Sequence, residues 1–258
     1  MKYFCFTVDD NIRFLKEITE NRYQSIFEHP YLAMYRRFHK ECGLKVQLNL
    51  FYRMEDFDLS QVSDCHYEEW KENTDWLKLS FHSDCEVPRA YAHAGYDAVY
   101  QDCEKVHKEI TRFASASALA NTTTVHCCHL TEAGRKAMKD HGVYGLLGLF
   151  GIEDKPCTSY EVDEHNARRI RSGESVKLGG ISYASIDVVL NLFSKEEIIE
   201  QLQSLIQRKN IQVMIHEQYF YRDYANYQPD FEEKLCATFS YLCSHGYESS
   251  FYEDLVES

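Results

Sequence analysis

Short apolar runs alternate with amphipathic stretches almost from one end of the chain to the other, and this alternation limits the possible folds more than any other feature. Apolar runs bounded by turn residues predict buried strands, and the amphipathic stretches between them predict helices that cover a parallel sheet. The 258 residues, 44% of them hydrophobic, are enough to fill one large core. We therefore expect one α/β domain over residues 1–258.

The number of predicted strands favours a barrel over an open sheet. The expected strands are Tyr3–Val8, Lys45–Tyr52, Trp76–His82, Thr122–His129, Gly142–Phe150, Gln212–His216 and Glu248–Phe251. The expected helices are Arg13–Thr19, Tyr31–Cys42, Tyr67–Asn73, Tyr96–Ala114, Thr131–Asp140, Lys195–Lys209 and Pro229–Ser244. Ser194 before Lys195-Glu196-Glu197 predicts a capping box at the start of one of these helices.

The regular alternation breaks over residues 153–191. The turn signals Ser172-Gly173-Glu174 and Leu178-Gly179-Gly180 lie beside short β-prone pieces in this segment. We expect a β-hairpin insertion that forms a wall or lid over one end of the barrel.

Charge and composition exclude several classes of partner. The formal net charge of −13 argues against nucleic acid or an anionic membrane surface, because both attract basic proteins. No apolar run reaches membrane-spanning length, and the chain begins directly with a strand instead of a leader. The ten cysteines are scattered through strands and helices, which favours a reducing, cytoplasmic location.

The pair Asp9-Asp10 ends the first apolar run and is the first sign of chemistry. Two adjacent carboxylates repel each other, so they need a compensating cation, a shared proton or open solvent. A divalent metal would compensate them, and a solvated acidic turn before a helix is the plainer alternative.

Other strands also end in titratable side chains. His82 ends the third predicted strand, His126 and His129 end the fourth, and His216 ends the sixth. Because the carboxyl ends of parallel strands share one face of a barrel, we expect these side chains to converge there. The pattern predicts a catalytic site at that face.

Three of these strand ends carry recognisable motifs: Phe6-Thr7-Val8-Asp9-Asp10, Leu79-Ser80-Phe81-His82 and Met214-Ile215-His216. In order and spacing the chain resembles the polysaccharide deacetylase superfamily, of the carbohydrate esterase family 4 type with the NodB-homology fold. The resemblance spans most of the chain, and each motif is a few residues long. It implies a distorted (β/α)7 barrel, which agrees with the strand count, and the β-hairpin insertion expected from the turn signals would be added to that barrel.

The resemblance also implies roles for individual residues. Asp9 corresponds to the catalytic base and His216 to the general acid, while Asp10 and His82 correspond to metal ligands. The implied activity is hydrolysis of an N-acyl (amide C–N) bond of a sugar or other small polar substrate by metal-activated water. Zinc is the expected metal, and manganese, iron and cobalt are the alternatives.

The chain departs from the family motif at its second metal-binding histidine. The family has H-x-x-x-H, whereas this chain has His82-Ser83-Asp84-Cys85-Glu86. Glutamate can bind a metal through oxygen, so Asp10, His82 and Glu86 form the predicted ligand set. His93 or His126 could complete the site instead, and a metal-free site is a further alternative.

The family's arginine motif after the fourth strand is also missing. Arg89 is the nearest basic substitute, and Asp187 could take an orienting role in the pocket. The side chains predicted to bind substrate are His126, Asp187, Glu217, Tyr219 and Arg89.

These departures leave two other functions open. One is a catalytically degenerate deacetylase-fold protein that binds carbohydrate or has a regulatory role. The other is a different metal hydrolase on a TIM-like barrel that uses His126 or His129 with Asp9. The expected partner in each case is a carbohydrate or another small molecule.

Overall fold

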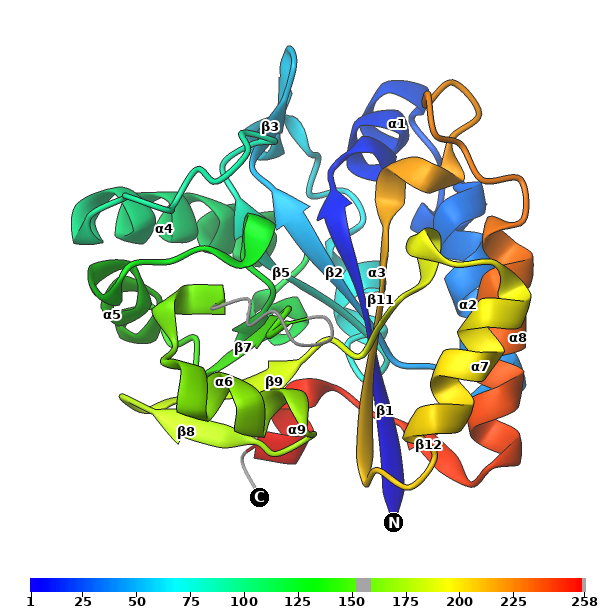
Figure 1. Cartoon of the computed structure of the whole chain (residues 1–258). Helices are drawn as coiled ribbons and strands as arrows, with labels where there is room; N and C mark the ends of the chain where they lie inside the picture. The colour runs from blue at the N-terminus through cyan, green and yellow to red at the C-terminus, as the bar shows by residue number, and fades with distance from the viewer. Residues whose placement is uncertain (152–158, 257–258) are drawn as a thin grey trace.

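The computed structural model describes residues 1–151 and 159–256, and it confirms an α/β fold organised as a distorted (β/α)7 barrel. Parallel strands run in the same direction inside a layer of helices (Figure 1). In chain order these strands are β1 (Lys2–Asn11), β2 (Val46–Phe51), β5 (Leu77–Ser83), β6 (Thr122–Thr123), β7 (Gly145–Gly148), β9 (Ile181–Ser185) and β11 (Asn210–His216).

The barrel strands form two sheets, and β3 (Arg53–Met54) and β4 (Phe57–Asp58) form a separate antiparallel pair. The larger sheet has the order β10–β11–β1–β2–β5, where β10 is Val188–Val189, and β12 (Tyr247–Ser249) pairs with the start of β1. The smaller sheet has the order β6–β7–β9–β8, where β8 is Val176–Leu178. An isolated bridge between Leu79 and Leu119 joins the two sheets, and the amide of Ala120 donates to the carbonyl of Leu79 over 2.8 Å.

Helices cover the outside of the barrel. In Figure 1, α2, α7 and α8 lie together along one side of the larger sheet, while α4 and α5 lie side by side on the opposite side of the molecule. The helix bounds are α1 (Arg13–Asn21), α2 (Pro30–Cys42), α3 (Tyr67–Glu72), α4 (Tyr96–Phe113), α5 (Glu132–Asp140), α6 (Glu164–Arg171), α7 (Lys195–Leu205), α8 (Phe231–Ser244) and α9 (Tyr252–Val256). The capping box predicted at Ser194 is present at the start of α7.

The core lies between the larger sheet and its covering helices. Strand β1 is buried along most of its length, as expected for a central parallel strand. The ring of Phe239 on α8 packs edge to face against Phe6 of β1, with centroids 5.0 Å apart. Phe38 of α2 packs against the same Phe239 ring at 5.2 Å. Burial of each ring contributes about 1.5–3 kcal/mol to the free energy of folding. This packing holds β1 in place as the scaffold of the site.

The predicted strand Thr122–His129 is wrong over most of its length. Only Thr122–Thr123 forms β6, and the chain then turns into a short 3-10 helix, η4 (His126–Cys128). Cys127 and Cys128 have φ angles of 57° and 54°, which no regular strand contains.

The segment predicted as an insertion contains the expected hairpin and more. Strands β8 and β9 pair antiparallel around Gly179 and Gly180, whose positive φ angles of 59° and 90° suit a tight two-residue turn. However, β9 also pairs parallel with β7, so it is a strand of the barrel and no lid. Helix α6 lies in the same segment, and residues 152–158 of the predicted insertion fall outside the described residues.

Two further features bear on the expectations from composition. Among residues 1–151 and 159–256, no helix combines the length and apolarity needed to cross a membrane. The cysteines within these ranges are free thiols.

Candidate functional site

The site begins at a bulge in β1. Neighbouring residues of a regular strand point to opposite faces, so Asp9 and Asp10 would normally diverge. Here the pairing of β1 with β2 shifts register between Val8 and Asn11, and Asp10 has a φ of 62°. A left-handed conformation of this kind is costly for a residue with a side chain, and such strain concentrates at functional sites. The bulge lets both carboxylates act on the same histidine, His82.

Three donor atoms converge at the end of β1. Oδ1 of Asp10 lies 3.0 Å from Nε2 of His82 and 3.3 Å from Nδ1 of His126. The two histidine nitrogens are 3.2 Å apart. His82 is the next-to-last residue of β5 and His126 begins η4, so the cluster joins the carboxyl ends of β1, β5 and β6. All three side chains are largely buried, with exposed fractions of 8% for Asp10, 3% for His82 and 13% for His126.

The hydrogen bonds around His82 show what this cluster can bind. Its Nδ1 donates to the carbonyl oxygen of Thr124 over 2.5 Å. In the neutral ring Nε2 then has only a lone pair, which faces the carboxylate of Asp10. A second proton on His82, a proton donated by Nδ1 of His126 or a cation among the three atoms would each satisfy this contact. Ligand atoms about 2.0–2.1 Å from a tetrahedral metal are about 3.3 Å apart, so the donor spacing fits a divalent ion.

The pKa values follow the same arrangement. Burial alone would raise the pKa of Asp10, but hydrogen bonds from His126 and His82 hold it well below its usual range. Burial opposes the charged form of His82, yet Asp9 and Asp10 outweigh it and raise the pKa of His82. The cluster thus keeps a negative carboxylate facing nitrogen atoms, which suits a bound cation.

Asp9 lies in a different environment from its neighbour. Its side chain is buried, and Nδ2 of Asn49 on β2 donates to its Oδ1 over 2.6 Å. Burial raises the pKa of Asp9, although the nearby His82 and His216 act in the opposite direction. A buried carboxylate with a raised pKa is a stronger base than one in solvent.

His216 lies opposite Asp9. The pairing of β1 with β11 sets Asp9 directly beside His216. Nδ1 of His216 is 2.8 Å from Oδ1 of Asn191, an amide on the 3-10 helix η6 (Leu190–Leu192). Because an amide oxygen accepts, Nδ1 carries the proton and Nε2 is the nitrogen that can exchange one.

A cavity of about 330 Å³ opens beside this cluster. Nε2 of Gln218 donates to Oδ2 of Asp10 over 2.8 Å, and the ring of Phe51 packs against both histidines at 5.2 Å. The cavity is lined by Asp10, Ile12, Arg13, Phe51, Arg53, Met54, Glu55, Cys85, Glu86, Glu217, Gln218 and Tyr224. Its size suits a single small polar molecule.

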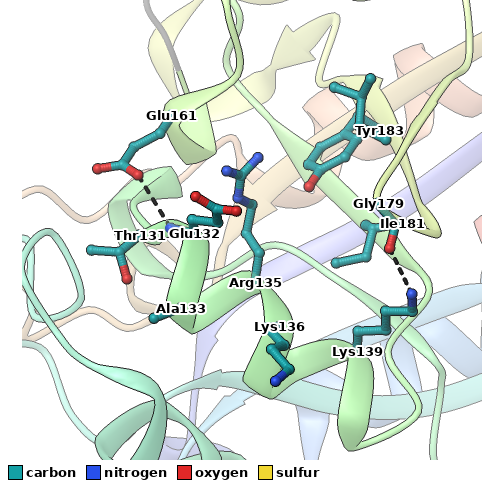
Figure 2. Close-up of a pocket in the computed structure, with 11 residues that line it drawn as sticks. Thr131, Glu132, Ala133, Arg135, Lys136, Lys139, Glu161, Gly179, Ile181 and Tyr183 are labelled. Carbon is teal, nitrogen blue, oxygen red and sulfur yellow. Dashed lines mark hydrogen bonds between the residues drawn. The ribbon is translucent and has the colours of Figure 1, made fainter.

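A larger cavity, of about 930 Å³, lies between α5 and the β8–β9 hairpin (Figure 2). Figure 2 shows Arg135 and Lys139 of α5 along this cavity, with Lys139 beside Gly179 and the acidic Glu161 at the other end, next to Glu132. Nζ of Lys139 donates to the carbonyl of Gly179 over 2.7 Å. None of the strand-end acids or histidines lines this cavity, whereas Asp10 lines the smaller one.

The structure brings His126, and not Glu86, to Asp10 and His82. Glu86 is exposed and lines the outer part of the smaller cavity, outside the group of converging donor atoms. His93 and Arg89 are also exposed, and Arg89 has a φ of 58° in the loop after β5. The predicted ligand set of Asp10, His82 and Glu86 therefore differs from the observed cluster, because the chain turns outward after His82.

Asp187 lies away from the cluster, at the opposite end of the strands. It directly precedes β10, accepts a hydrogen bond from the amide of Gln212 over 2.8 Å, and forms an ion pair with Arg208. Burial nevertheless raises the pKa of Asp187 to about 6. Its predicted place in the pocket is wrong, since β11 runs from Gln212 toward His216 and separates the two ends.

Glu217 has a structural task. Its carboxylate accepts from the amides of Ile12, Arg13 and Phe14 over 2.7–3.0 Å and from the hydroxyl of Tyr221 over 2.9 Å. It therefore caps the start of α1, right after the bulge of β1. These four donors occupy the carboxylate of the buried Glu217, and the residue also lines the smaller cavity.

Tyr219 remains near the predicted site. Its ring centroid lies 6.1 Å from that of His216 and 5.3 Å from that of Tyr224, which lines the cavity. Gln218 holds Asp10, whereas Asn49 and Asn191, which hold Asp9 and His216, were not predicted from the sequence. The polar Asn49 inside the apolar run Leu48-Asn49-Leu50 was the available signal.

Comparisons with known proteins agree with this fold. No family model matches the chain, and no curated protein matches it in sequence. Among solved structures it is similar to a family 4 acetyl xylan esterase from Clostridium thermocellum in complex with a cobalt ion. That match has a TM-score of 0.55 and 12% identity and covers 99% of this chain and 91% of the esterase.

Two other structures show how widely this barrel is used. A CE4 family pseudoenzyme from Bacillus anthracis matches with a TM-score of 0.53 and 11% identity, over 99% of this chain and 65% of that one. A 4-alpha-glucanotransferase from Thermococcus litoralis matches with a TM-score of 0.63 and 14% identity, over 100% of this chain and 41% of that one.

These matches establish the class of fold. The chain has the fold of the CE4 polysaccharide deacetylases and is a divergent example of it. Identities of 11–14% show the fold alone, and one neighbour is a pseudoenzyme. Function must therefore be argued from the side chains of this chain.

Proposed function

We propose that this protein is a metal-dependent hydrolase that cleaves an N-acyl bond of a sugar or another small polar molecule. One observation carries the proposal: Asp10, His82 and His126 converge beside Asp9 and His216 at the carboxyl ends of the strands. The cavity of about 330 Å³ that Asp10 lines gives a substrate access to them. The deacetylase fold of the chain supports this class of reaction.

Asp10, His82 and His126 would hold the metal through one oxygen and two nitrogens. That set is typical of zinc, with cobalt, manganese and iron as less favoured alternatives. A bound divalent ion lowers the pKa of water to about 7 and polarises the acyl oxygen. Thr124 holds Nδ1 of His82 and so directs its Nε2 toward the ion.

Asp9 is the base that takes the proton of the attacking water. Burial raises its pKa, which makes it a better proton acceptor than an exposed aspartate. Nδ2 of Asn49 holds one carboxylate oxygen and leaves the other to act. In this chain the neutral amide of Asn49 supplies the orientation for which the resemblance implied an arginine.

His216 is the acid that protonates the leaving nitrogen. Asn191 fixes the ring through Nδ1, so Nε2 delivers the proton. Because β1 and β11 place Asp9 and His216 side by side, the base and the acid flank the same scissile bond. Amides need this protonation because an amine anion is a poor leaving group.

The cavity beside the cluster suits a small polar substrate. Arg53, Glu86 and Tyr224 give its outer part charged and aromatic groups that can bind hydroxyl groups. Tyr219 packs against both His216 and Tyr224, which places a further aromatic ring near the acid. An N-acetylated monosaccharide or short oligosaccharide is the expected substrate.

The test measures acetate release from N-acetylglucosamine and its short oligomers by protein stripped with a chelator and then reloaded with zinc. We expect activity only after reloading, and no activity in Asp10→Ala. Asp187→Asn is the matched control, because this buried aspartate lies at the far end of the strands. Binding of the sugars without acetate release would contradict the proposal and favour a catalytically degenerate binding protein.

A further inference from the structure

A second cluster of metal-ligand side chains lies between α4 and α5. Cys103 and His107 are on α4, and His141 directly follows α5 as its C-terminal cap. One ligand atom from each of the three lies within 4.8 Å of the others. The sulfur of Cys103 is 3.5 Å from Nε2 of His107, and the rings of His107 and His141 meet edge to face at 5.7 Å.

The spacing along α4 directs two of these ligands to the same place. Residues four apart lie on one face of a helix, which is how paired ligands on helices commonly bind a single ion. Cys103 has an exposed fraction of 0% and His107 of 8%. Within the described residues, the sulfur of Cys103 is the hydrogen-bond partner of the His107 ring. A thiol is a weak partner for a buried imidazole.

His141 supplies an independent indication. Its Nε2 is buried and has no hydrogen-bond partner among the described residues. The ring of Tyr100 packs against it at 4.0 Å and limits its rotation. Burial lowers the pKa of His141, and the carboxylates of Glu104 and Asp140 create a negative potential around it. A nitrogen lone pair is thus held ready in surroundings that favour a cation.

Helices α4 and α5 pack closely enough for a shared ion. A Cβ on Gly134 of α5 would lie 3.2 Å from a methyl group of Val99 on α4, so the glycine permits the close contact. The hydroxyl of Tyr96 on α4 also donates to Asp140 of α5 over 2.9 Å. The cluster lies among these contacts, which hold its three residues in register.

We propose that Cys103, His107 and His141 form a second metal site, which binds zinc and links α4 to α5. The ligands are the Cys103 thiolate, a ring nitrogen of His107 and Nε2 of His141. His141 is only half-buried, so water can complete a tetrahedral set. Binding releases the thiol proton of Cys103 to solvent while both histidines bind as neutral rings. The site is structural and independent of the proposed hydrolase activity.

The first experiment uses cobalt as a probe of sulfur ligation. A thiolate bound to Co²⁺ gives intense charge-transfer absorption in the near ultraviolet, whereas the Asp10, His82 and His126 cluster offers only oxygen and nitrogen. We expect this absorption in the intact protein and in Asp10→Ala, and its loss in Cys103→Ala. Cys5→Ala, which removes another buried thiol, is the control that should keep it. Its persistence in Cys103→Ala, or its absence from the intact protein, would overturn the proposal.

The second experiment counts zinc after equilibrium dialysis. We expect two ions per chain in the intact protein, one in Asp10→Ala and one in Cys103→Ala. His141→Gln, a change at a half-buried helix end, should also lose one ion without loss of the fold. Two ions bound by both Cys103→Ala and His141→Gln would contradict the second site. If the intact protein binds a single zinc ion, and Cys103→Ala loses it while Asp10→Ala keeps it, the result counts against the proposed function and supports this second site.

Discussion

The two candidate metal-binding clusters use similar side chains in very different surroundings. Asp10, His82 and His126 converge at the carboxyl ends of strands, beside a cavity of about 330 Å³. Cys103, His107 and His141, by contrast, are packed between α4 and α5, where the ring of Tyr100 covers His141. The strand-end cluster therefore lies beside space for a substrate, whereas a structural metal site between two helices needs no such space. Ligand type therefore predicts metal binding, whereas position in the barrel predicts chemistry.

The neighbours of the two clusters differ in the same sense. Asp9 and His216 flank the strand-end cluster and can accept and donate a proton. The carboxylates of Glu104 and Asp140 lie near His141 and favour a cation, and neither residue lines the cavity beside the strand-end cluster. Variants that remove one cluster at a time should separate these two roles.

The largest effect is expected for Asp10→Ala. The change removes a metal ligand, and with it several kcal/mol of transition-state stabilisation, so kcat/KM should fall by about 10³-fold or more. The cobalt–thiolate absorption of the helical cluster should be unchanged. Steady-state kinetics and cobalt spectra of the same preparation measure both. Simultaneous loss of activity and absorption would show that the clusters are not independent.

His216→Gln should have the next largest effect. Loss of the general acid should lower kcat by about 10²–10⁴-fold while the metal content stays constant. An aryl acetate has a leaving group that needs little protonation, so the variant should lose much less activity on that substrate. Kinetics on both substrates measure the difference. Equal losses on the two would argue that His216 only holds the site together.

Cys103→Ala should change stability and leave catalysis alone. Zinc bound to the intact protein at a hundred times its Kd adds about 2.7 kcal/mol to the free energy of unfolding, and this variant should lack that part. Denaturant titrations with and without zinc measure the difference. The comparison between clusters breaks down if the variant also loses hydrolysis, or if zinc stabilises it as much as the intact protein.

Glu86→Gln should have the smallest effect. Its side chain is exposed and outside the group of converging donor atoms, so we expect less than about a threefold change in kcat/KM and no loss of metal. His126→Gln is the matched change inside the cluster and should lower the metal affinity. Metal loss in Glu86→Gln with retention in His126→Gln would restore the ligand set predicted from the sequence.

Much of the fold followed from the alternation of strands and helices. The strands around Tyr3–Val8 and Gln212–His216 lie where their apolar runs predicted, because each is buried on both faces. Strand β6 was much overestimated, since Thr124 to His129 look β-prone while the chain turns there. The place of β9 in the barrel depends on its pairing with β7, which no local sequence pattern predicts.

The site was predictable where a strand ends in a titratable residue. Asp10 and His82 follow this rule, and the structure brings them together. His126 reaches them through η4, and this turn is held by distant contacts such as the hydroxyl of Tyr160, which accepts from the amide of Val125 over 3.1 Å. The prediction for Asp187 was wrong because the register of β10 against β11 decides at which end of the barrel this residue lies, and the sequence does not show that register.

The most direct test of the central claim is an anomalous difference map of crystals of the zinc-loaded protein, recorded at the zinc edge. We predict a peak within about 2.0–2.2 Å of Oδ1 of Asp10, Nε2 of His82 and Nδ1 of His126, beside Asp9 and His216. No peak at these atoms, or a peak bound by Glu86 in place of His126, would contradict the account.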